Sequence, residues 1–131
     1  NNTNGVRESS IDWANAGGIS QTLINTSEAI TGATSWTNVF SIPVYIPANA
    51  NTMEAKVNAK RISAGGDSNL RLFNGTSSGT AVGVTATSYT WITEVLTCDI
   101  TSQSGWTTIS LQGNVTAGND VYVDRVILRF I

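Results

Sequence analysis

The chain has 131 residues, a net charge of −2 and only 12% charged residues, so no basic surface argues for binding to nucleic acids or anionic membranes. It contains no histidine and therefore lacks the commonest catalytic base and the commonest metal ligand. Solubility must come from Ser, Thr and Asn, which make up about a third of the chain. This composition is common on extracellular and virion surfaces, and we expect the protein there.

The first 18 residues are polar and rich in glycine, a composition typical of an arm or linker. We expect this arm, residues 1–18, to precede a single domain of residues 19–131. Ile11 and Trp13 are among its few large apolar residues, and we expect them to anchor the arm on its own domain or on a neighbouring copy. The chain would then form a homo-oligomer through the arm or through a sheet edge. Because the chain begins with Asn, we expect a mature form or an excised piece without a signal peptide.

Beyond the arm, short segments alternate between apolar and polar residues, and Gly- and Asn-rich turns separate them. In chain order these segments are residues 19–26, 36–46, 52–62, 70–74, 80–84, 88–100, 106–115 and 120–131. About eight short strands without a convincing helix predict an all-β fold, an antiparallel β-sandwich or barrel. No apolar stretch approaches the roughly 18 residues of a membrane span, so we expect none.

Three positions in these strands carry specific expectations. Trp36 lies on the most apolar face of its segment, and we expect it in the core. Pro43 lacks an N–H and therefore belongs at a sheet edge or a bulge. Cys98 is the only cysteine and lies in an apolar run, which predicts a buried, unreactive thiol. The third segment alternates most cleanly, and its inward side chains are predicted to be Met53, Ala55, Val57 and Ala59.

The last segment, residues 120–131, is apolar on both sides, which predicts a central or covered strand. Strict alternation would place on one face Tyr122, Val126, Leu128 and Phe130. It would place on the other face Val121, Val123, Ile127 and Ile131. Because the chain ends on such a strand, we expect the domain to close only when its C-terminus is inserted.

The second half of the chain contains four characteristic segments. They read LRLFNGTSSGTAVG (residues 70–83), SYTWITEVL (88–96), GWTTISLQ (105–112) and VYVDRVILRF (121–130). In this order they resemble jelly-roll, galactose-binding-like modules of phage tail and virion surface proteins and of secreted carbohydrate-binding proteins. The resemblance covers roughly residues 52–131 and implies a jelly-roll β-sandwich.

Many modules of this kind keep a structural calcium ion near the chain ends, held by acidic side chains of the first and closing strands. The resemblance implies this role for Asp124, together with Glu8 or Glu28. Calcium requires about six to eight oxygen ligands, and an acidic pair is not clear in the first strand. The alternative is that Asp124 forms a hydrogen bond near a sheet edge or an ion pair with Arg125.

The acidic residues of the chain do not predict catalysis. Asp120 and Asp124 would lie roughly 13 Å apart along one strand, beyond the separation of about 6.5–9.5 Å in inverting glycosidases. Glu94 and Asp99 would face opposite ways in a regular strand. Cys98 has no histidine partner, and no serine lies in a G-x-S-x-G turn. We therefore expect a protein that is not an enzyme.

Sugar binding is the activity that the aromatic residues favour. Aromatic rings stack on the apolar side of pyranose rings, while amide and carboxylate groups supply hydrogen bonds. We expect Tyr89, Trp91 and Trp106 to bind ligand. Tyr89 and Trp91 share a strand face with threonines, and Trp106 begins a strand beside a glycine.

Two functions are compatible with these features. The first is a non-catalytic structural or adhesive module of an extracellular or virion surface assembly, tail-fibre-like, that recognises surface glycans. The alternative is a carbohydrate-binding module excised from a longer secreted glycan-active enzyme.

Overall fold

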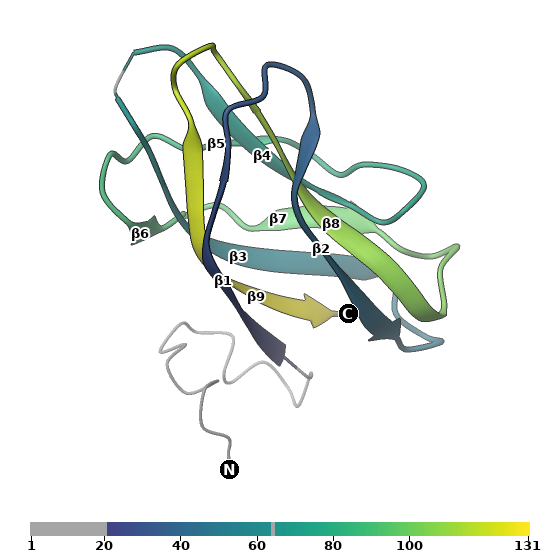
Figure 1. The fold of residues 1–131 in the computed structure, drawn as a ribbon. Coiled ribbons are helices and arrows are strands. Elements are labelled where there is room, and N and C mark those ends of the chain that lie inside the picture. Colours follow the sequence, from purple (N-terminus) through teal and green to yellow (C-terminus); the bar gives the residue numbers. More distant parts are fainter. Residues whose placement is uncertain (1–20, 64) are drawn as a thin grey trace.

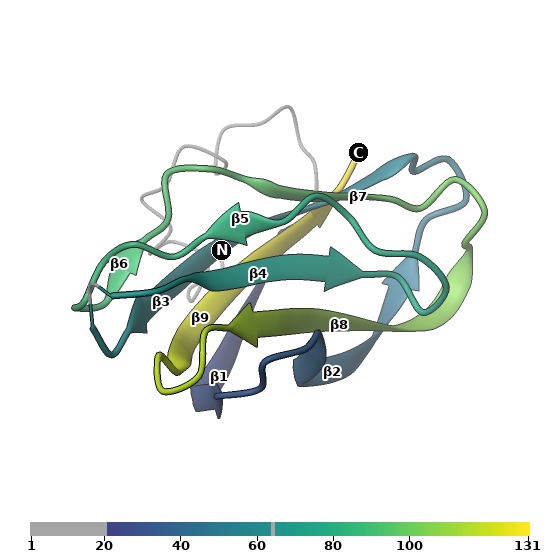
Figure 2. The ribbon, with the colours of Figure 1, turned by 90° about the horizontal axis from the view of Figure 1, so that it is seen from above.

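The computed structural model describes residues 21–63 and 65–131, in which nine strands form two antiparallel sheets packed face to face (Figures 1 and 2). The all-β sandwich predicted from the sequence is confirmed. The predicted arm, with Glu8, Ile11 and Trp13, lies outside the described residues. No helix that is long and apolar enough to cross a membrane occurs in the described part of the chain.

The five-stranded sheet is built around β3. Its order is β1 (Gln21–Thr31), β9 (Val121–Phe130), β3 (Thr52–Arg61) and β6 (Thr90–Trp91), with β7 (Leu96–Asp99) also paired to β3. The single strand predicted over residues 88–100 is therefore wrong in detail, because two short strands pair with different parts of β3.

The four-stranded sheet has the order β2 (Thr37–Ile46), β8 (Gly105–Val115), β4 (Ser68–Phe73) and β5 (Val82–Gly83). Strand β2 is thus an edge strand, which confirms the position predicted for Pro43. Figure 2 shows the two layers from above, with β4 and β8 in one layer and β3 and β9 in the other.

The core between the sheets consists of aliphatic side chains. Those of β3 are fully buried, as predicted, namely Met53, Ala55, Val57 and Ala59. The facing sheet contributes the fully buried Leu70, Leu72, Ile109 and Leu111. Cys98 is buried at the margin of this core, as expected, and burial together with the neighbouring charge of Asp99 raises the pKa of its thiol. A buried thiol with a raised pKa is a weak nucleophile.

Strand β9 lies between β1 and β3, which confirms the central position predicted for the closing strand. Its pairing with β3 shifts register at Asp124, so that this residue is an extra one in a β-bulge. The side chains of β9 that join the core are therefore Val121 and Val123 before the bulge and Val126 and Leu128 after it. The strict alternation predicted for this strand is wrong, because the bulge exchanges the two faces halfway along it.

A second bulge lies in β2 at Val39. The residues on either side of it, Asn38 and Phe40, pair with two consecutive residues of β8. Phe40 packs against the core, whereas the side chain of Asn38 bonds to a residue on the outer side of the sheet. Trp36 lies on that outer side too, half-buried beneath an arginine. The prediction that Trp36 belongs to the core is therefore wrong.

Candidate functional site

The outer face of the four-stranded sheet, turned away from the core, is formed by every second residue of its three long strands. These side chains are Asn38, Ser41, Pro43 and Tyr45 of β2, Trp106, Thr108, Ser110, Gln112 and Asn114 of β8, and Asn69, Arg71 and Phe73 of β4. Trp36, just before β2, completes the set. Aromatic rings stand at both ends of this face, and hydroxyl and amide groups lie between them together with the side chains of Pro43 and Phe73.

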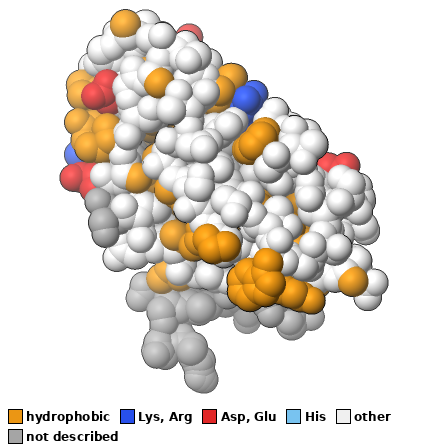
Figure 3. Space-filling model, turned by 45° about the vertical axis from the view of Figure 1, so that its right-hand side comes forward, with side chains coloured by type: hydrophobic (Ala, Val, Ile, Leu, Met, Phe, Trp, Pro, Cys, Tyr) orange, Lys and Arg blue, Asp and Glu red, His pale blue; other side chains and the backbone are white. Residues whose placement is uncertain are grey.

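Tyr45 and Trp106 form an aromatic pair at one end of the outer face. They are direct neighbours across β2 and β8, and their rings meet edge to face at 76° with centroids 5.6 Å apart. Trp106 is 74% exposed and Tyr45 is 59% exposed. Figure 3 shows a cluster of exposed apolar side chains over the end of β2 and the start of β8. Two large aromatic rings that contact each other and remain exposed to solvent indicate a surface that is suited to a binding partner.

The middle of the outer face is uncharged and combines hydroxyl groups with the apolar side chains of Pro43 and Phe73, which pair with Thr108 and Ser110. The hydroxyl oxygens of Ser41 and Ser110 are 2.8 Å apart in a hydrogen bond, and Thr108 lies opposite Pro43. In Figure 3 most of the surface around the apolar cluster is uncharged, and charged side chains lie near its margins. Since each strand residue advances the chain by about 3.4 Å, the face extends roughly 20 Å along β8.

Trp36, Asn38, Arg71 and Gln112 form what we call the arginine cluster at the other end of the outer face. The guanidinium carbon of Arg71 lies 4.2 Å from the centre of the Trp36 ring, a cation–π contact. Arg71 Nε donates to Gln112 Oε1 at 2.9 Å, and Gln112 Nε2 donates to Asn38 Oδ1 at 3.1 Å. Side chains from two neighbouring segments, residues 36–38 and β8, therefore hold the guanidinium in one orientation.

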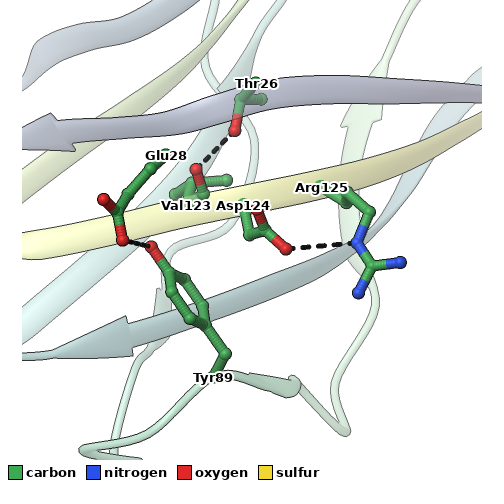
Figure 4. Close-up of polar contacts among 6 residues, drawn as sticks. All are labelled: Thr26, Glu28, Tyr89, Val123, Asp124 and Arg125. Atoms are coloured by element: carbon green, nitrogen blue, oxygen red, sulfur yellow. Dashed lines mark hydrogen bonds and ion pairs between the residues drawn. The ribbon is translucent and has the colours of Figure 1, made fainter.

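Tyr89 and Trp91 lie on the other side of the molecule, at the outer face of the five-stranded sheet. Lys60 Nζ is 4.7 Å from the centre of the Tyr89 ring, and the guanidinium carbon of Arg125 is 5.6 Å from that of Trp91. The Tyr89 hydroxyl donates to Glu28 Oε2 at 2.7 Å (Figure 4). Burial first, and then the bond to Glu28, raise the pKa of Tyr89 above its ordinary value. Both rings are thus already engaged by charged side chains of the protein.

A small cavity of about 200 Å³ opens beside Trp91 at the rim of the sandwich. Residues 83–86 and 90–94 line it, including the hydroxyl of Thr90 and the carboxyl of Glu94. Its volume is below the range of roughly 300–1,000 Å³ that is common for ligand pockets. The cavity therefore offers room for a small group rather than for a chain of sugar rings.

The structure separates the three predicted ligand-binding residues onto two sheets. Trp106 lies on the outer face of the four-stranded sheet, whereas Tyr89 and Trp91 lie on the opposite side. The sequence reasoning missed Tyr45, although the alternation of residues 36–46 already directed it away from the core. It also missed Arg71, whose hydrogen-bond partner lies 41 residues away and left no local signal.

The two acidic side chains of the expected calcium site that the structure describes, Asp124 and Glu28, each contact another side chain of the protein. Asp124 Oδ2 accepts a hydrogen bond from Arg125 Nε at 3.2 Å, and Glu28 is bonded to Tyr89 (Figure 4). Calcium takes about six to eight oxygen ligands. In the described ranges no three His, Cys, Asp or Glu side chains are grouped to hold a metal. Glu8, the expected second ligand, lies outside those ranges. Asp124 instead makes the ion pair with Arg125 that was the alternative.

No protein-family model and no curated protein matches the chain. Among solved structures, the CBM36-1 domain of a multidomain xylanase from the hindgut metagenome of Trinervitermes trinervoides is similar with a TM-score of 0.53 and 14% identity. That match covers 83% of this chain and 96% of the domain. The C-terminal domain of EclA, described as a sugar-binding protein, matches with a TM-score of 0.53 and 12% identity, covering 97% of this chain and 98% of that one.

A third similar structure is the insecticidal delta-endotoxin Cry8Ea1 from Bacillus thuringiensis, with a TM-score of 0.55 and 10% identity. The match covers 79% of this chain but only 19% of the endotoxin, so the chain corresponds to a small part of it. At these identities the likeness concerns the fold alone. It supports the jelly-roll type of sandwich that was predicted from the sequence.

Proposed function

We propose that this chain is a non-catalytic carbohydrate-binding module that binds a polysaccharide along the outer face of its four-stranded sheet. The observation that carries the proposal is the aromatic pair, because Trp106 and Tyr45 expose 74% and 59% of their surfaces. A pyranose ring has an apolar side made of C–H groups, which stacks on such rings. The stacking buries apolar area on both partners and contributes roughly 25 cal/mol for each Å².

The remainder of the outer face suits the polar edge of a sugar chain. Hydroxyl groups of Ser41 and Thr108 and amide groups of Gln112 and Asn114 both donate and accept hydrogen bonds, as sugar hydroxyls do. With a length of roughly 20 Å, the face accommodates several consecutive rings rather than one. The ligand we propose is therefore an oligosaccharide or polysaccharide, not a monosaccharide.

Two further observations support a binding role without catalysis. Strands β2, β4, β5 and β8 contain no Asp, Glu or His, so their outer face offers neither an acid nor a base for glycosidic cleavage. Two of the proteins of similar fold are described as a CBM36 domain of a xylanase and a sugar-binding protein. The same face would serve in a longer secreted enzyme or in an adhesive, tail-fibre-like assembly on an extracellular or virion surface.

Affinity electrophoresis in gels that contain soluble polysaccharides tests this proposal. Trp106→Ala is expected to weaken retention by roughly 30-fold in dissociation constant, which corresponds to about 2 kcal/mol for an aromatic hot spot. Tyr45→Ala is expected to act in the same direction. Both variants should keep the unfolding temperature of the parent, because both side chains are exposed.

Trp91→Ala is the matched control, since it removes the same side chain from the other sheet. It should leave retention unchanged. If Trp91→Ala abolished retention while Trp106→Ala did not, the binding site would lie at the rim of the five-stranded sheet, and the proposal for the outer face would be wrong. Tyr89 and Trp91 would then be the ligand-binding residues, as the sequence suggested.

Self-association is a separate proposal, and it concerns the surfaces through which two copies of the chain would meet. Strand β2 is an edge, and a second copy can pair with an edge strand only where backbone N–H groups are free. Pro43 removes one of these groups in the middle of β2. We therefore propose that any homo-oligomer uses the aromatic pair or the arm rather than β2, and light scattering of the parent and of Trp106→Ala distinguishes these contacts.

A further inference from the structure

We infer that the polysaccharide is acidic and that Arg71 binds the carboxylate of a uronic acid ring. This inference deepens the proposed function and rests on it, because it concerns the same outer face. It assigns different roles to the two ends of that face. The aromatic pair stacks on the apolar side of one ring, and the arginine cluster selects a charged ring farther along the chain.

The distribution of charge on the outer face is the first observation. The strands β2, β4, β5 and β8 carry no acidic residue and no lysine, and their only charged side chain is Arg71. The rest of the described chain has a mixed charge, and β3 alone contains Glu54, Lys56, Lys60 and Arg61. Among the side chains of these four strands, Arg71 is therefore a single positive group with no carboxylate on the same strands to compete for it.

The second observation is how the arginines of the described chain are satisfied. Arg125 contacts Asp124 at 3.2 Å, and Arg129 contacts Glu54 at 2.6 Å, so both of these cations are paired with an acid of the protein. Arg61 donates from Nη1 to the carbonyl oxygen of Gly66 at 2.9 Å. Arg71 makes no ion pair within the described ranges. Its positive charge is balanced only by the π face of Trp36 and by a neutral amide.

The third observation is which N–H donors of Arg71 already have a hydrogen-bond partner in the protein. Nε donates to the side-chain oxygen Oε1 of Gln112, and the guanidinium lies over the ring of Trp36. Neither terminal nitrogen of Arg71 has a hydrogen-bond partner among the described residues. Two terminal N–H groups of a fixed guanidinium form the planar fork that matches the two oxygens of a carboxylate.

Preorganisation explains why this fork would discriminate between ligands. A free arginine loses rotamer entropy when a ligand fixes its long side chain, and this loss weakens binding. Here Trp36 and Gln112 fix the side chain before the ligand arrives, and the bond from Gln112 to Asn38 fixes the amide in turn. A carboxylate gains a charge-assisted hydrogen bond that is roughly twice as strong as the neutral bond to a hydroxyl.

The test compares ligands that share one backbone and differ only in charge. Polygalacturonate is compared with its methyl ester, and glucuronoxylan with the same polymer after carboxyl reduction, by isothermal titration calorimetry and affinity electrophoresis at low and high salt. The parent chain is expected to bind the acid form of at least one pair ten or more times more tightly than its neutral form. The preference should shrink as the salt concentration rises.

Variants of Arg71 assign the preference to its side chain. Arg71→Gln is expected to abolish the preference and to bind both forms as the parent binds the neutral one. Arg71→Lys keeps the charge without the fork and should recover only part of it. Lys60→Gln removes a positive charge from the other sheet and should change nothing. Circular dichroism and the unfolding temperature identify a variant that has lost the fold.

Four results would overturn the inference. Equal or tighter binding of the neutral forms, still sensitive to Trp106→Ala, would remove the acidic ligand and leave the proposed function standing. A preference that survives Arg71→Gln would place the selective group elsewhere. Tighter binding of dextran sulfate than of either uronate would indicate a general attraction for anions. If the parent chain bound neither the neutral nor the acidic polymers, the proposed function would be overturned as well.

Discussion

Among single side chains, Tyr89 connects the most distant parts of one sheet. It precedes β6 at one side of the five-stranded sheet, and its hydroxyl reaches Glu28 of β1 at the opposite edge (Figure 4). Glu28 has a φ of 61°, a left-handed conformation that costs a non-glycine residue about 1–2 kcal/mol. The hydrogen bond therefore helps to hold a strained residue in the irregular part of β1 where the register with β9 shifts.

The raised pKa of Tyr89 predicts a specific dependence on pH. A tyrosine whose pKa is higher in the folded state than in the unfolded state, where it is near 10, contributes stability that is fully present below about pH 10. That contribution disappears as the pH rises toward the folded-state value. Tyr89→Phe cannot ionise at this position, so the stability advantage of the parent over this variant should decrease between roughly pH 9 and pH 11.

Urea unfolding of the parent and of Tyr89→Phe across this pH range measures the effect, and comparison of the two chains cancels the other groups that titrate there. A difference in unfolding free energy that stays constant up to pH 11, about one pH unit above the ordinary tyrosine pKa, would contradict the prediction.

At the scale of secondary-structure elements, the two bulges decide which side chains reach each face. Asp124 in β9 lets Val123 and Val126 both enter the core, and Val39 in β2 turns Trp36 outward. Each bulge adds one residue to a strand, and one residue is enough to exchange the faces of everything beyond it.

Deletion of Asp124 tests this view of β9. Without the extra residue, either Val121 and Val123 or Val126 and Leu128 must leave the core. Exposure of two such side chains costs about 3–6 kcal/mol, which is a large part of the total stability of a domain this size. We expect the deleted chain to unfold at much lower urea concentration or not to fold. Asp124→Asn keeps the residue count and should remain close to the parent, and a fully stable deletion variant would show that the bulge is dispensable.

The bulges also mark the limit of what the sequence could predict. Alternation identified the long strands, the inward side chains of β3 and the central position of β9, because each depends on residues that are neighbours in the chain. A one-residue bulge has no such signature, and Trp36 was placed in the core for that reason. The candidate site was found only at Trp106. Tyr45 and Arg71 join it through cross-strand pairing, which brings together segments that lie far apart in the sequence.

For the molecule as a whole, β9 is the last strand in the chain and yet lies inside the five-stranded sheet, which is incomplete without it. Strand β9 pairs with β1 on one side and with β3 on the other, so nothing else joins the two within this sheet. It also contributes four aliphatic side chains to the core, namely Val121, Val123, Val126 and Leu128. Their burial accounts for about 6–12 kcal/mol before entropy is subtracted.

A chain that ends at Gly118 is therefore expected to have no cooperative unfolding transition. The lost burial is comparable with the roughly 5–15 kcal/mol by which a domain is stable. Near-ultraviolet circular dichroism should show no fixed environment for the tryptophans, and addition of a synthetic peptide of residues 119–131 should restore the signal. A sharp thermal transition of the truncated chain by itself would contradict this account.

The pairing of β1 with β9 has one more consequence. Gln21 lies beside Arg129, so the chain enters and leaves the described domain at neighbouring points of the five-stranded sheet. The domain can therefore be spliced into a surface loop of a host protein as a cassette, with both junctions close together. The C-terminal junction lies beside the turn that follows β2, because the carbonyl oxygen of Ile131 accepts hydrogen bonds from the backbone of Asn51 and Thr52. A carrier would therefore be attached at the same end of the sandwich as the aromatic pair, which ends β2 and begins β8.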